Sequence, residues 1–501
     1  MNDHEAFLQG ILQHPDDDAP RLVYADWLDE HTDPRGEFIR VQCELAKLPV
    51  DDPRWDELEQ REWDLLRANE AEWTKDIKSI VTDWKFHRGF VDTVSIGARG
   101  FVDGAAKLFS RAPVRQVALT RLGTSRVSGK ELAERPELAR LHSLEVKGEF
   151  PAADCQPLLN SSHLQRLIAL AFPDSDSSVL LILAKKGPPA LEELNLSGML
   201  RFTQHLRSLT AKLPFKLKKL NLSGTNLDAQ HCTQLGSAPS LASLTHLDLS
   251  NNLGVRVPGA EALAKSPQLS NLVALALGRT KSAVNGCQIG LKGTQALAAS
   301  PTLAHLESLD LRDNNLADSA VAAIVGSPHW TRLRDLWLDS NKVTTKGIET
   351  LVNWPGLARF TTLSFWVNYG IGDAGVKLLA QSPSVANLLH LDVGYTTLSA
   401  AGMLSVANSS HLKRLRHLNI EGNKIGDAGV KALVGSPVVA LLRDLNLART
   451  EMKDGAAKAI IASPHLRHLR TLKLNGNKLT NPTKKALEER FGPGVCQFGQ
   501  Q

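Results

Sequence analysis

Apolar residues return along the chain in the pattern L-x-x-L-x-L, about every 27 residues from residue 114 onward. Apolar and polar residues alternate at the start of each unit, which predicts a short strand. A stretch with helical spacing follows in residues 415–440, where Val430, Leu433 and Val434 are apolar. Asp427 is the expected N-cap of that helix. One unit is therefore a strand, a loop, a helix and a turn.

Fourteen such units follow one another, and most successive starts are 26 to 28 residues apart. Neither the strand nor the helix of one unit can bury its apolar face alone, so neighbouring units must stack in register. The sequence therefore predicts an α/β solenoid, a horseshoe with a parallel sheet on its concave face and helices on its convex face. The unit that starts at Leu272 has an insertion at residues 284–293, either a neutral loop or a functional one. The first positions of the units are Val114, Leu141, Leu164, Leu191, Leu217, Leu244, Leu272, Leu306, Leu333, Phe360, Leu388, Leu415, Leu442 and Leu469.

These residues resemble the leucine-rich repeat family, and the helix-containing units look like its ribonuclease-inhibitor-like branch. The resemblance covers residues 114 to about 490. In that family the ninth residue of a unit is Asn, whose amide pairs with loop backbone groups, and a Thr hydroxyl serves as well. The first three units depart from this pattern, with Leu122, Glu149 and Phe172 at the ninth position. Ten of the other units have Asn or Thr there: Asn252, Asn314, Asn341, Asn368, Asn423, Asn477, Thr225, Thr280, Thr396 and Thr450.

The pattern divides the chain into four parts. Residues 1–83 have helical periodicity without the repeat and carry 9 Lys+Arg against 22 Asp+Glu, a charge of −13, which predicts a small acidic all-α module. Residues 84–113 are expected to cap the N-terminal end of the repeats, residues 114–481 to form the repeats, and residues 482–501 to form an exit cap and tail. Residues 15–42 resemble the short repeat-companion domain of certain large bacterial families, a resemblance that implies no activity.

Composition restricts the class of protein further. The chain has 501 residues, 43% of them hydrophobic, and a net charge of +5, a balance that excludes general disorder. The longest apolar run, residues 179–184, is too short to span a membrane, and the N-terminal residues do not read as a secretory signal. Five cysteines without a CxxC pair favour a reducing compartment. We therefore expect a cytoplasmic protein.

No arrangement of residues suggests an enzyme. Residues 370–375 satisfy G-x-G-x-x-G, but the same junction elsewhere reads NKIGDAG, so these glycines are expected to serve the repeat's own loop. His390 and His417 share one unit position and are expected about 5 Å apart. They are either solvated side chains or, with Asp392 and Glu421, a metal or pH-sensitive site. The leading expectation is a chain without catalytic residues, cofactor or metal.

The third, fifth, seventh and eighth positions of each unit point away from the leucine core. In the eighth to twelfth units these positions combine aromatic and charged side chains, and three aromatics trace a diagonal across three strands. Exposed aromatics often anchor protein interfaces, although here they can also merely cover neighbouring side chains. The excess of carboxylates favours a basic partner segment. The predicted partner-binding residues are Trp337, Trp366, Tyr395, Asp310, Arg312, Asp335, Asp339, Asp392 and Glu421.

These features favour a non-enzymatic scaffold that binds a protein or peptide on the concave face. The alternative is a regulator of an enzyme, such as a leucine-rich repeat protein that activates a GTPase, with Arg312 as the candidate residue. A third possibility is a structural element of a larger assembly. Nucleic acid and membrane are not expected partners, and the oligomeric state stays open. Second-position residues form a basic rim that suits the acidic module of this or another molecule: Lys218, Arg334, Arg416, Arg443 and Arg470.

Overall fold

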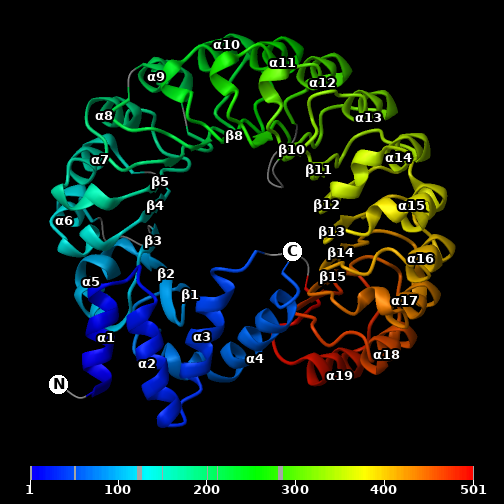
Figure 1. Ribbon diagram of the computed structural model, residues 1–501, viewed down its shortest axis with the longest axis horizontal. Coiled ribbons are helices and arrows are strands. Elements are labelled where there is room, and N and C mark those ends of the chain that lie inside the picture. The colour runs from blue at the N-terminus through cyan, green and yellow to red at the C-terminus, as the bar shows by residue number, and fades with distance from the viewer. Residues whose placement is uncertain are drawn as a thin grey trace. The chain divides into compact units, whose positions relative to one another are not determined.

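The chain forms two compact units, Met1–Asn221 and Leu222–Gln501. Both are built from short strands that alternate with helices, shown in Figure 1. The computed structural model describes residues 3–49, 52–120, 127–148, 150–199, 201–211, 213–279 and 286–499.

Four helices open the first unit, as the acidic, helically periodic segment predicted. Their apolar faces meet in a small core where Ile11, Tyr24 and Ile39 are buried together with Phe90 of a following strand. Burial of one apolar stripe per helix explains why the segment packs despite its charge. The helices are α1 (Asp3–Gln13), α2 (Ala19–Glu30), α3 (Arg35–Leu45) and α4 (Trp55–Trp73).

An antiparallel hairpin and a run of parallel strands complete the first unit. Strand β1 (Asp83–His87) pairs antiparallel with β2 (Phe90–Gly97), and strands β2 to β7 then pair in parallel in chain order. The remaining elements are α5 (Ala98–Arg111), β3 (Gln116–Thr120), α6 (Gly129–Ala133), β4 (Ser143–Lys147), α7 (Ala152–Leu159), β5 (Ala169–Ala171), α8 (Val179–Lys185), β6 (Glu193–Asn195), α9 (Phe202–Thr210) and β7 (Lys219–Asn221).

Strand pairing corrects the register of the third repeat. Leu144, the fourth residue of its unit, pairs with Leu170 of the next strand. The third unit therefore begins at Leu167 and not at Leu164, which lies in a 3-10 helix before the strand. Phe172 consequently takes the inward sixth position rather than the ninth. The sequence prediction failed here because both leucines fit the first position of a degenerate unit.

Strand β2 has the same register one unit before the first predicted repeat. Val94 pairs with Val117 of β3, and Val91, Val94 and Ile96 are all buried. Their spacing is that of the first, fourth and sixth positions of a repeat, with β-branched residues in place of leucines. A search for leucines alone missed this strand, although β-branched residues suit a strand core equally well.

In the second unit, the described residues form ten strands that pair in parallel in chain order. The helices lie together on the outer side of this curved run of strands, as Figure 1 shows. The predicted α/β solenoid is therefore confirmed. The strands are β8 (His246–Asp248), β9 (Ala274–Ala276), β10 (Ser308–Asp310), β11 (Asp335–Trp337), β12 (Thr362–Ser364), β13 (His390–Asp392), β14 (His417–Asn419), β15 (Asp444–Asn446), β16 (Thr471–Lys473) and β17 (Cys496–Gln497).

The helices of the second unit are mostly two to three turns long, the length that a short repeat leaves between its loop and its turn. The last one ends at Phe491, and Gly492 directly after it has a positive φ of 88° and stops the helix as predicted. They are α10 (Ala229–Gly236), α11 (Arg256–Ala264), α12 (Gly290–Ala298), α13 (Asp318–Val325), α14 (Thr345–Val352), α15 (Gly372–Gln381), α16 (Ala400–Ala407), α17 (Gly426–Val434), α18 (Asp454–Ala462) and α19 (Asn481–Phe491).

Asparagines at the ninth position bond to the loop backbone, as predicted. The amide of Asn341 donates to the carbonyls of Leu311 and Leu338, and its oxygen accepts from the backbone amides of Asn314 and Leu316. Each such residue therefore links its own loop to that of the preceding unit. Similar bonds are made by Asn252, Asn314, Asn368, Asn423 and Asn477. A hydroxyl donates to the carbonyl three residues earlier at Thr225, Thr396 and Thr450. Leu122, Glu149 and Thr280 lie outside the described residues.

The sequence pattern predicted Asp427 as the N-cap of α17, and this prediction is wrong. It lies inside the first turn, and its carboxylate accepts a hydrogen bond of 2.7 Å from the backbone amide of Lys453 in the next unit. The aspartate at this position therefore ties neighbouring repeats together instead of capping its own helix. The same bond is made by Asp318 to Thr344, Asp373 to Ser399 and Asp454 to Thr480.

The insertion predicted at residues 284–293 is packed in its described part. Cys287 and Ile289 are completely buried, and the Cys287 thiol donates to the carbonyl of Leu249. Helix α12 begins at Gly290. Residues 284 and 285 lie outside the described part of the chain.

Candidate functional site

The predicted partner-binding residues all lie in the second unit, on strands β10 to β14 or directly after them. Parallel pairing places Asp310 beside Trp337, Trp337 beside Ser364, and Ser364 beside Asp392. The fifth positions of four units therefore form one row across the strand face. The seventh and eighth positions follow in the turns at the ends of these strands.

A hollow of about 510 Å³ opens on this strand face. Five of the predicted residues contribute to its lining, namely Arg312, Asp339, Trp366, Asp392 and Glu421. The other four predicted residues are not among the lining groups. The hollow also contains charged or titratable side chains that the prediction did not include: Arg279, His390, His417, Asp444, Arg449 and Lys473.

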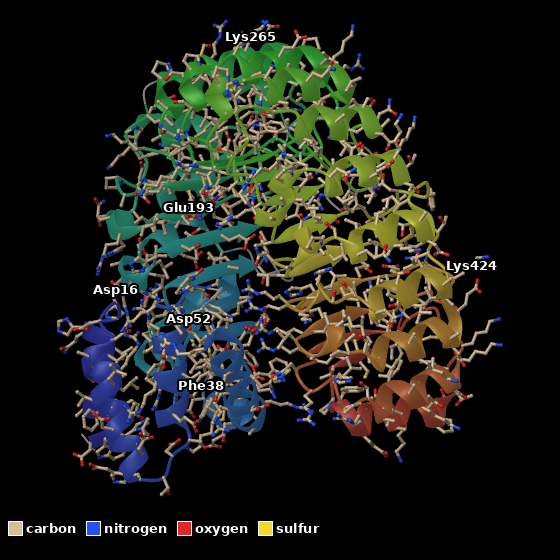
Figure 2. The ribbon with its side chains drawn as sticks, turned by 45° about the vertical axis from the view of Figure 1, so that its right-hand side comes forward. Asp16, Phe38, Asp52, Glu193, Lys265 and Lys424 are labelled. Carbon is tan, nitrogen blue, oxygen red and sulfur yellow. The ribbon has the colours of Figure 1, made fainter. Side chains whose placement is uncertain are left out.

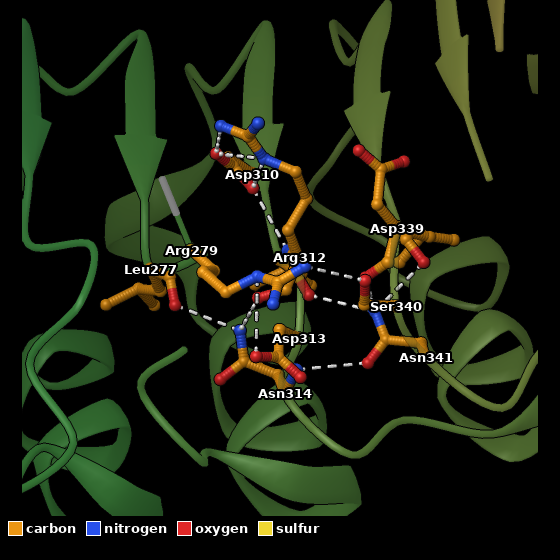
Figure 3. A network of polar contacts seen from close by, with 11 residues as sticks. Leu277, Arg279, Asp310, Arg312, Asp313, Asn314, Asp339, Ser340 and Asn341 are labelled. Carbon is orange, nitrogen blue, oxygen red and sulfur yellow. Dashed lines mark hydrogen bonds and ion pairs between the residues drawn. The ribbon is translucent and has the colours of Figure 1, made fainter. Parts of the chain in front are cut away.

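Arg312 is held by a carboxylate of its own strand. Its guanidinium donates to both carboxylate oxygens of Asp310, at 2.9 Å from Nε to Oδ1 and 2.5 Å from the terminal nitrogen to Oδ2, as Figure 3 shows. Burial lowers the pKa of Arg312, but the hydrogen bonds and charge of Asp310 raise it by more. A bidentate pair of this kind fixes the guanidinium plane.

A second arginine, Arg279, reaches into the same network from the unit before. It donates to the hydroxyl of Ser340 at 3.1 Å and lies 3.6 Å from the carboxylate of Asp313, also seen in Figure 3. Each of these two arginines therefore has a carboxylate partner within its neighbourhood. The pairs Arg312 with Asp310 and Arg279 with Asp313 therefore form a neutral network of paired charges on one side of the hollow.

Two of the three predicted aromatics contact each other. The rings of Trp366 and Tyr395 meet edge to face, with centroids 5.6 Å apart. Each ring also covers a glycine: a Cβ added at Gly394 would lie 2.6 Å from Trp366, and one added at Gly422 would lie 2.3 Å from Tyr395. The aromatics therefore partly cover the neighbouring repeat, and both stay half-exposed.

Trp337 is also half-exposed, but it does not join this pair. Among the ring contacts of the described residues, the indole of Trp337 meets neither Trp366 nor Tyr395. The diagonal of three aromatics expected from the sequence is therefore a contacting pair and a separate tryptophan. The reason is that Trp337 is the fifth residue of its repeat and lies on a strand, whereas Trp366 and Tyr395 are the seventh and eighth residues of theirs and lie in the turns after the strands.

Tyr395 connects the aromatic pair to a charged network. Its hydroxyl lies 3.4 Å from a carboxylate oxygen of Glu421 and accepts a hydrogen bond of 3.2 Å from the guanidinium of Arg449. The other oxygen of Glu421 accepts from the amide of Asn446. Tyr395 and Arg449 both occupy eighth positions with positive φ, 51° and 53°, so the left-handed turn directs their side chains across the strand face.

Asp339 and Asp392 carry the largest electrostatic perturbation of the carboxylates in the hollow. Burial raises the pKa of Asp339 to about 6. Burial, followed by repulsion from Asp339, raises the pKa of Asp392 to about 7. Asp335, by contrast, lies at the other end of its strand, where it accepts a hydrogen bond from the hydroxyl of Thr361.

His390 and His417 lie side by side as predicted, with ring centroids 5.5 Å apart. The nitrogen Nδ1 of His417 lies 2.6 Å from a carboxylate oxygen of Asp444. Burial, followed by the neighbouring His417, lowers the pKa of His390 to about 4. The ring of His390 is therefore neutral at pH 7, and it is largely shielded from solvent. In the described residues, no group of three or more His, Cys, Asp or Glu side chains is arranged to hold a metal.

Two arginines and a tyrosine are among the residues of this region that the sequence reasoning missed. Arg279 and Arg449 occupy eighth positions of units outside the range considered, and Tyr369 is 61% exposed on the loop after β12. A list of the eighth positions in all units contains both arginines. No sequence signal distinguishes Tyr369, because its loop position is not part of the outward strand pattern.

The residues of the predicted basic rim differ in their exposure and in their partners. Lys218 and Arg334 pair with Glu192 and Glu307, at 2.8 and 2.9 Å. Arg416 and Arg443 are buried rather than exposed. They therefore do not extend the exposed basic rim expected from the sequence.

In the first unit, basic side chains at the start of the repeats contact the acidic helical module. Asp16, in the loop between α1 and α2, lies 2.7 Å from the guanidinium of Arg115 and within 4 Å of His142 and Arg166; Asp16 is labelled in Figure 2. Burial raises the pKa of Asp16, but the hydrogen bond from Arg115 and the nearby charges lower it by more. The loop of the helical module is thus fastened to the first repeats.

None of the described helices combines the length and apolar character needed to cross a membrane.

Comparison with known proteins supports the repeat assignment. Four segments, residues 240–264, 302–325, 411–434 and 465–482, match the family model described as leucine rich repeat. A search of curated proteins finds no match.

Two solved structures similar to this chain are a chain from the crystal structure of the Rad7 and Elc1 complex in yeast and an internalin (inlF) from Listeria monocytogenes str. 4b F2365. The first is 19% identical, covers 67% of this chain and 81% of the other, and has a TM-score of 0.50. The second is 16% identical, covers 73% and 83%, and has a TM-score of 0.33. The first likeness concerns the fold alone, and with the paired strands it supports an α/β solenoid, four segments of which match the leucine rich repeat model.

Proposed function

We propose that the chain is a non-enzymatic scaffold that binds a protein or peptide on the strand face of its second unit. The observation that carries this proposal is the hollow beside the half-exposed pair of Trp366 and Tyr395. Aromatic side chains next to a concave, partly polar surface are typical anchors of protein interfaces. The strands beneath them are paired with a neighbouring strand on each side, so binding costs little ordering of the scaffold.

The charge of this face supports a partner with a basic segment. Carboxylates and cations are equal in number in the lining of the hollow, but two of the arginines are paired with Asp310 and Asp313 outside that lining, which leaves the carboxylates in excess. The same surface is unfavourable for a phosphate backbone, because uncompensated carboxylates repel it. Trp337 and Asp335 lie outside the hollow and are proposed as peripheral contacts of a longer partner.

The bidentate pair of Arg312 with Asp310 argues against a regulator that inserts this arginine into a partner's active site. Such a role requires a guanidinium free to reach the developing charge of a bound nucleotide. Here, insertion would break three hydrogen bonds to Asp310. The scaffold is therefore the better supported of the two functions.

We propose further that the repeats belong to the ribonuclease-inhibitor-like branch, and that residues 1–83 are the bacterial repeat-companion module. In this proposal residues 84–113 cap the repeats of 114–481, and residues 482–501 close them. Helices in nearly every repeat support the first assignment. All five cysteines are buried and free, which supports a cytoplasmic setting.

Affinity capture from the native cell lysate tests the scaffold proposal. The bait is the full chain, compared with a Trp366→Ala, Tyr395→Ala double variant. We expect the double variant to lose at least about tenfold of its captured partner, because truncating interface aromatics typically costs more than about 1.4 kcal/mol of binding. Quantitative mass spectrometry of the captured proteins gives the ratio.

The matched control is Trp354→Ala, which removes a half-exposed indole that stacks on Arg359 after helix α14 rather than facing the hollow. Circular dichroism checks that all three chains are folded. If the double variant retains the same partners at the same level as the control, the strand face of the second unit is not the binding surface.

A further inference from the structure

The hollow on the second unit is large enough to be a binding site rather than a flat contact. Its volume of about 510 Å³ lies within the range of ligand pockets, roughly 300 to 1,000 Å³. Trp366 forms part of its wall, and Asp339 and Asp392 line it from either side of strand β12. An aromatic face beside two carboxylates is the arrangement that recognises an organic cation.

Only neutral groups donate hydrogen bonds to these two carboxylates in the described structure, as is also the case for Glu421. Asp339 accepts from the hydroxyl of Ser364 and from the backbone amide of Trp366. Asp392 accepts from the backbone amide of Gly394 and the side-chain amide of Asn419. Their hydrogen bonds hold both side chains in place, but no bonded cation neutralises them.

The cations that line the hollow are mostly engaged elsewhere. Arg312 binds Asp310, Arg279 lies beside Asp313, and the guanidinium of Arg449 donates to Tyr395. Lys473 also lines the hollow from strand β16. The charge balance around Asp339 and Asp392 therefore leaves negative charge for an incoming group to compensate.

The neighbours of these carboxylates set how readily they ionise. Burial is the main reason that the pKa of Asp339 rises to about 6 and that of Asp392 to about 7. An incoming cation would favour the ionised form of both and would expel their protons. The charged and titratable groups that act on them or line the hollow with them are Asp310, Arg312, Arg279, His390, His417, Glu421, Asp444, Arg449 and Lys473.

We propose that this hollow takes an arginine side chain of the partner, with its guanidinium between Asp339 and Asp392 and against the indole of Trp366. This inference rests on the proposed function and specifies its partner. A planar guanidinium donates in several directions within one plane and stacks on an aromatic face, whereas a lysine ammonium is a compact and strongly hydrated point charge. An anionic group placed between Asp339 and Asp392 would meet like charge.

Isothermal titration calorimetry of the full chain with short capped peptides tests this assignment. The probes are acetyl-Gly-Arg-Gly-amide and the same peptide with citrulline, the neutral isostere of arginine, or with lysine. We expect the arginine peptide to bind at least about tenfold more tightly than the citrulline peptide. Its affinity should rise at least about tenfold from pH 5.5 to pH 7.5, because binding releases protons from Asp339 and Asp392.

The variant Asp392→Asn keeps the size of the side chain and removes its charge, and we expect it to weaken the arginine peptide about tenfold and to flatten the pH profile. Glu349→Gln is the matched control, because it removes the same charge from the exposed surface of helix α14. The arginine assignment is overturned by equal binding of the arginine and citrulline peptides, by equal or tighter binding of the lysine peptide, or by a flat pH profile of the unmodified chain.

The outcomes also separate this inference from the scaffold proposal. If the arginine peptides do not discriminate, but Trp366→Ala with Tyr395→Ala still abolishes capture of a partner, the scaffold stands and the arginine assignment fails. If the arginine peptide binds as expected while the double variant retains its captured partners, the hollow binds arginine and the partner-binding surface lies elsewhere.

Discussion

The two units of the chain treat the ninth position of their repeats differently. In the second unit this position holds asparagines and threonines, and Asn341 alone bonds to five backbone groups of its own and the preceding repeat. Among the described ninth positions of the first unit, Ser175 and the apolar Met199 are both buried. The position is therefore inward in both units, but only the second uses it to connect repeats through amide side chains.

The loop of Met199 shows how a repeat manages without the amide. The backbone amide of Met199 itself donates to the carbonyl of Leu196, the carbonyl that corresponds to Leu338, which the side chain of Asn341 satisfies. The thioether then only fills space. The asparagine is therefore required where side-chain bonds connect successive loops. An apolar residue suffices where the backbone of the loop makes its own hydrogen bond.

Stability should fall most when an asparagine at the ninth position of the second unit is replaced by the methionine of the first unit. Asn341→Met leaves the backbone groups of Leu311, Leu338, Asn314 and Leu316 without their side-chain partner. Each buried, unpaired group costs about 1 to 3 kcal/mol, so we expect a loss of about 4 kcal/mol or more in the free energy of unfolding. Urea denaturation followed by circular dichroism measures it.

Asn353→Met is the control for this substitution, because Asn353 lies exposed at the end of helix α14. It should change the free energy of unfolding by about 0.5 kcal/mol or less. A loss in Asn341→Met no larger than in the control would mean that the amide ladder does not stabilise the second unit.

The reverse exchange in the first unit should have a smaller effect. Met199→Asn removes a buried thioether and places a polar amide in a loop whose carbonyl at Leu196 is already bonded. Loss of apolar burial and an unpaired amide together predict a destabilisation of about 2 to 3 kcal/mol, measured by the midpoint of thermal unfolding and by urea denaturation.

Met199→Leu accompanies this experiment because it conserves volume and apolar character, and it should cost less than about 1.5 kcal/mol. Wild-type stability of Met199→Asn would contradict the comparison, since it would show that the first unit accepts the amide as readily as the second.

The smallest expected effect sharpens the comparison at the neighbouring eighth position. Gly198 of the first unit has φ of 66°, whereas Val367 of the second, next to Trp366, has φ of 58°. A β-branched residue is strained there. Val367→Gly should therefore raise the free energy of unfolding by about 1 kcal/mol, as relief of about 1 to 2 kcal/mol outweighs the entropy cost of glycine of roughly 0.5 to 1 kcal/mol.

Val367→Ala keeps a Cβ in the left-handed conformation and should retain most of the strain, so only the glycine variant should gain stability in urea denaturation. A decrease on substitution by glycine would show that the contacts of the valine side chain outweigh its backbone strain. The position would then be held by packing rather than tolerated for a neighbouring binding residue.

Much of the fold followed from the spacing of leucines, and the failures are instructive. Leu164 and Leu167 both fit the first position of the third unit, and only the pairing of Leu144 with Leu170 decides between them. Strand β2 was missed because valine and isoleucine occupy its core positions. Asp427 looked like a helix cap within its own unit, yet its partner, Lys453, belongs to the next.

The candidate site was less predictable. The outward positions identified Trp366, Tyr395 and Asp392, but not that Trp337 stands apart. Nor did they identify Arg449, which reaches Tyr395 over a separation of 54 residues. Side chains on this face meet neighbours from units one or two repeats away, and their conformations depend on turns with positive φ that the strand pattern does not contain.

The repeating strand and helix, the solenoid and the amide ladder all follow from the amino-acid sequence, because a short unit that cannot bury its own apolar face must pack against copies of itself. The tertiary structure alone decided the register of the third repeat, the pairing of Arg312 with Asp310, and the hollow between Asp339 and Asp392. These features depend on which side chains from different repeats share one low-dielectric surface, where proximity and burial, not residue type, set charge and partner.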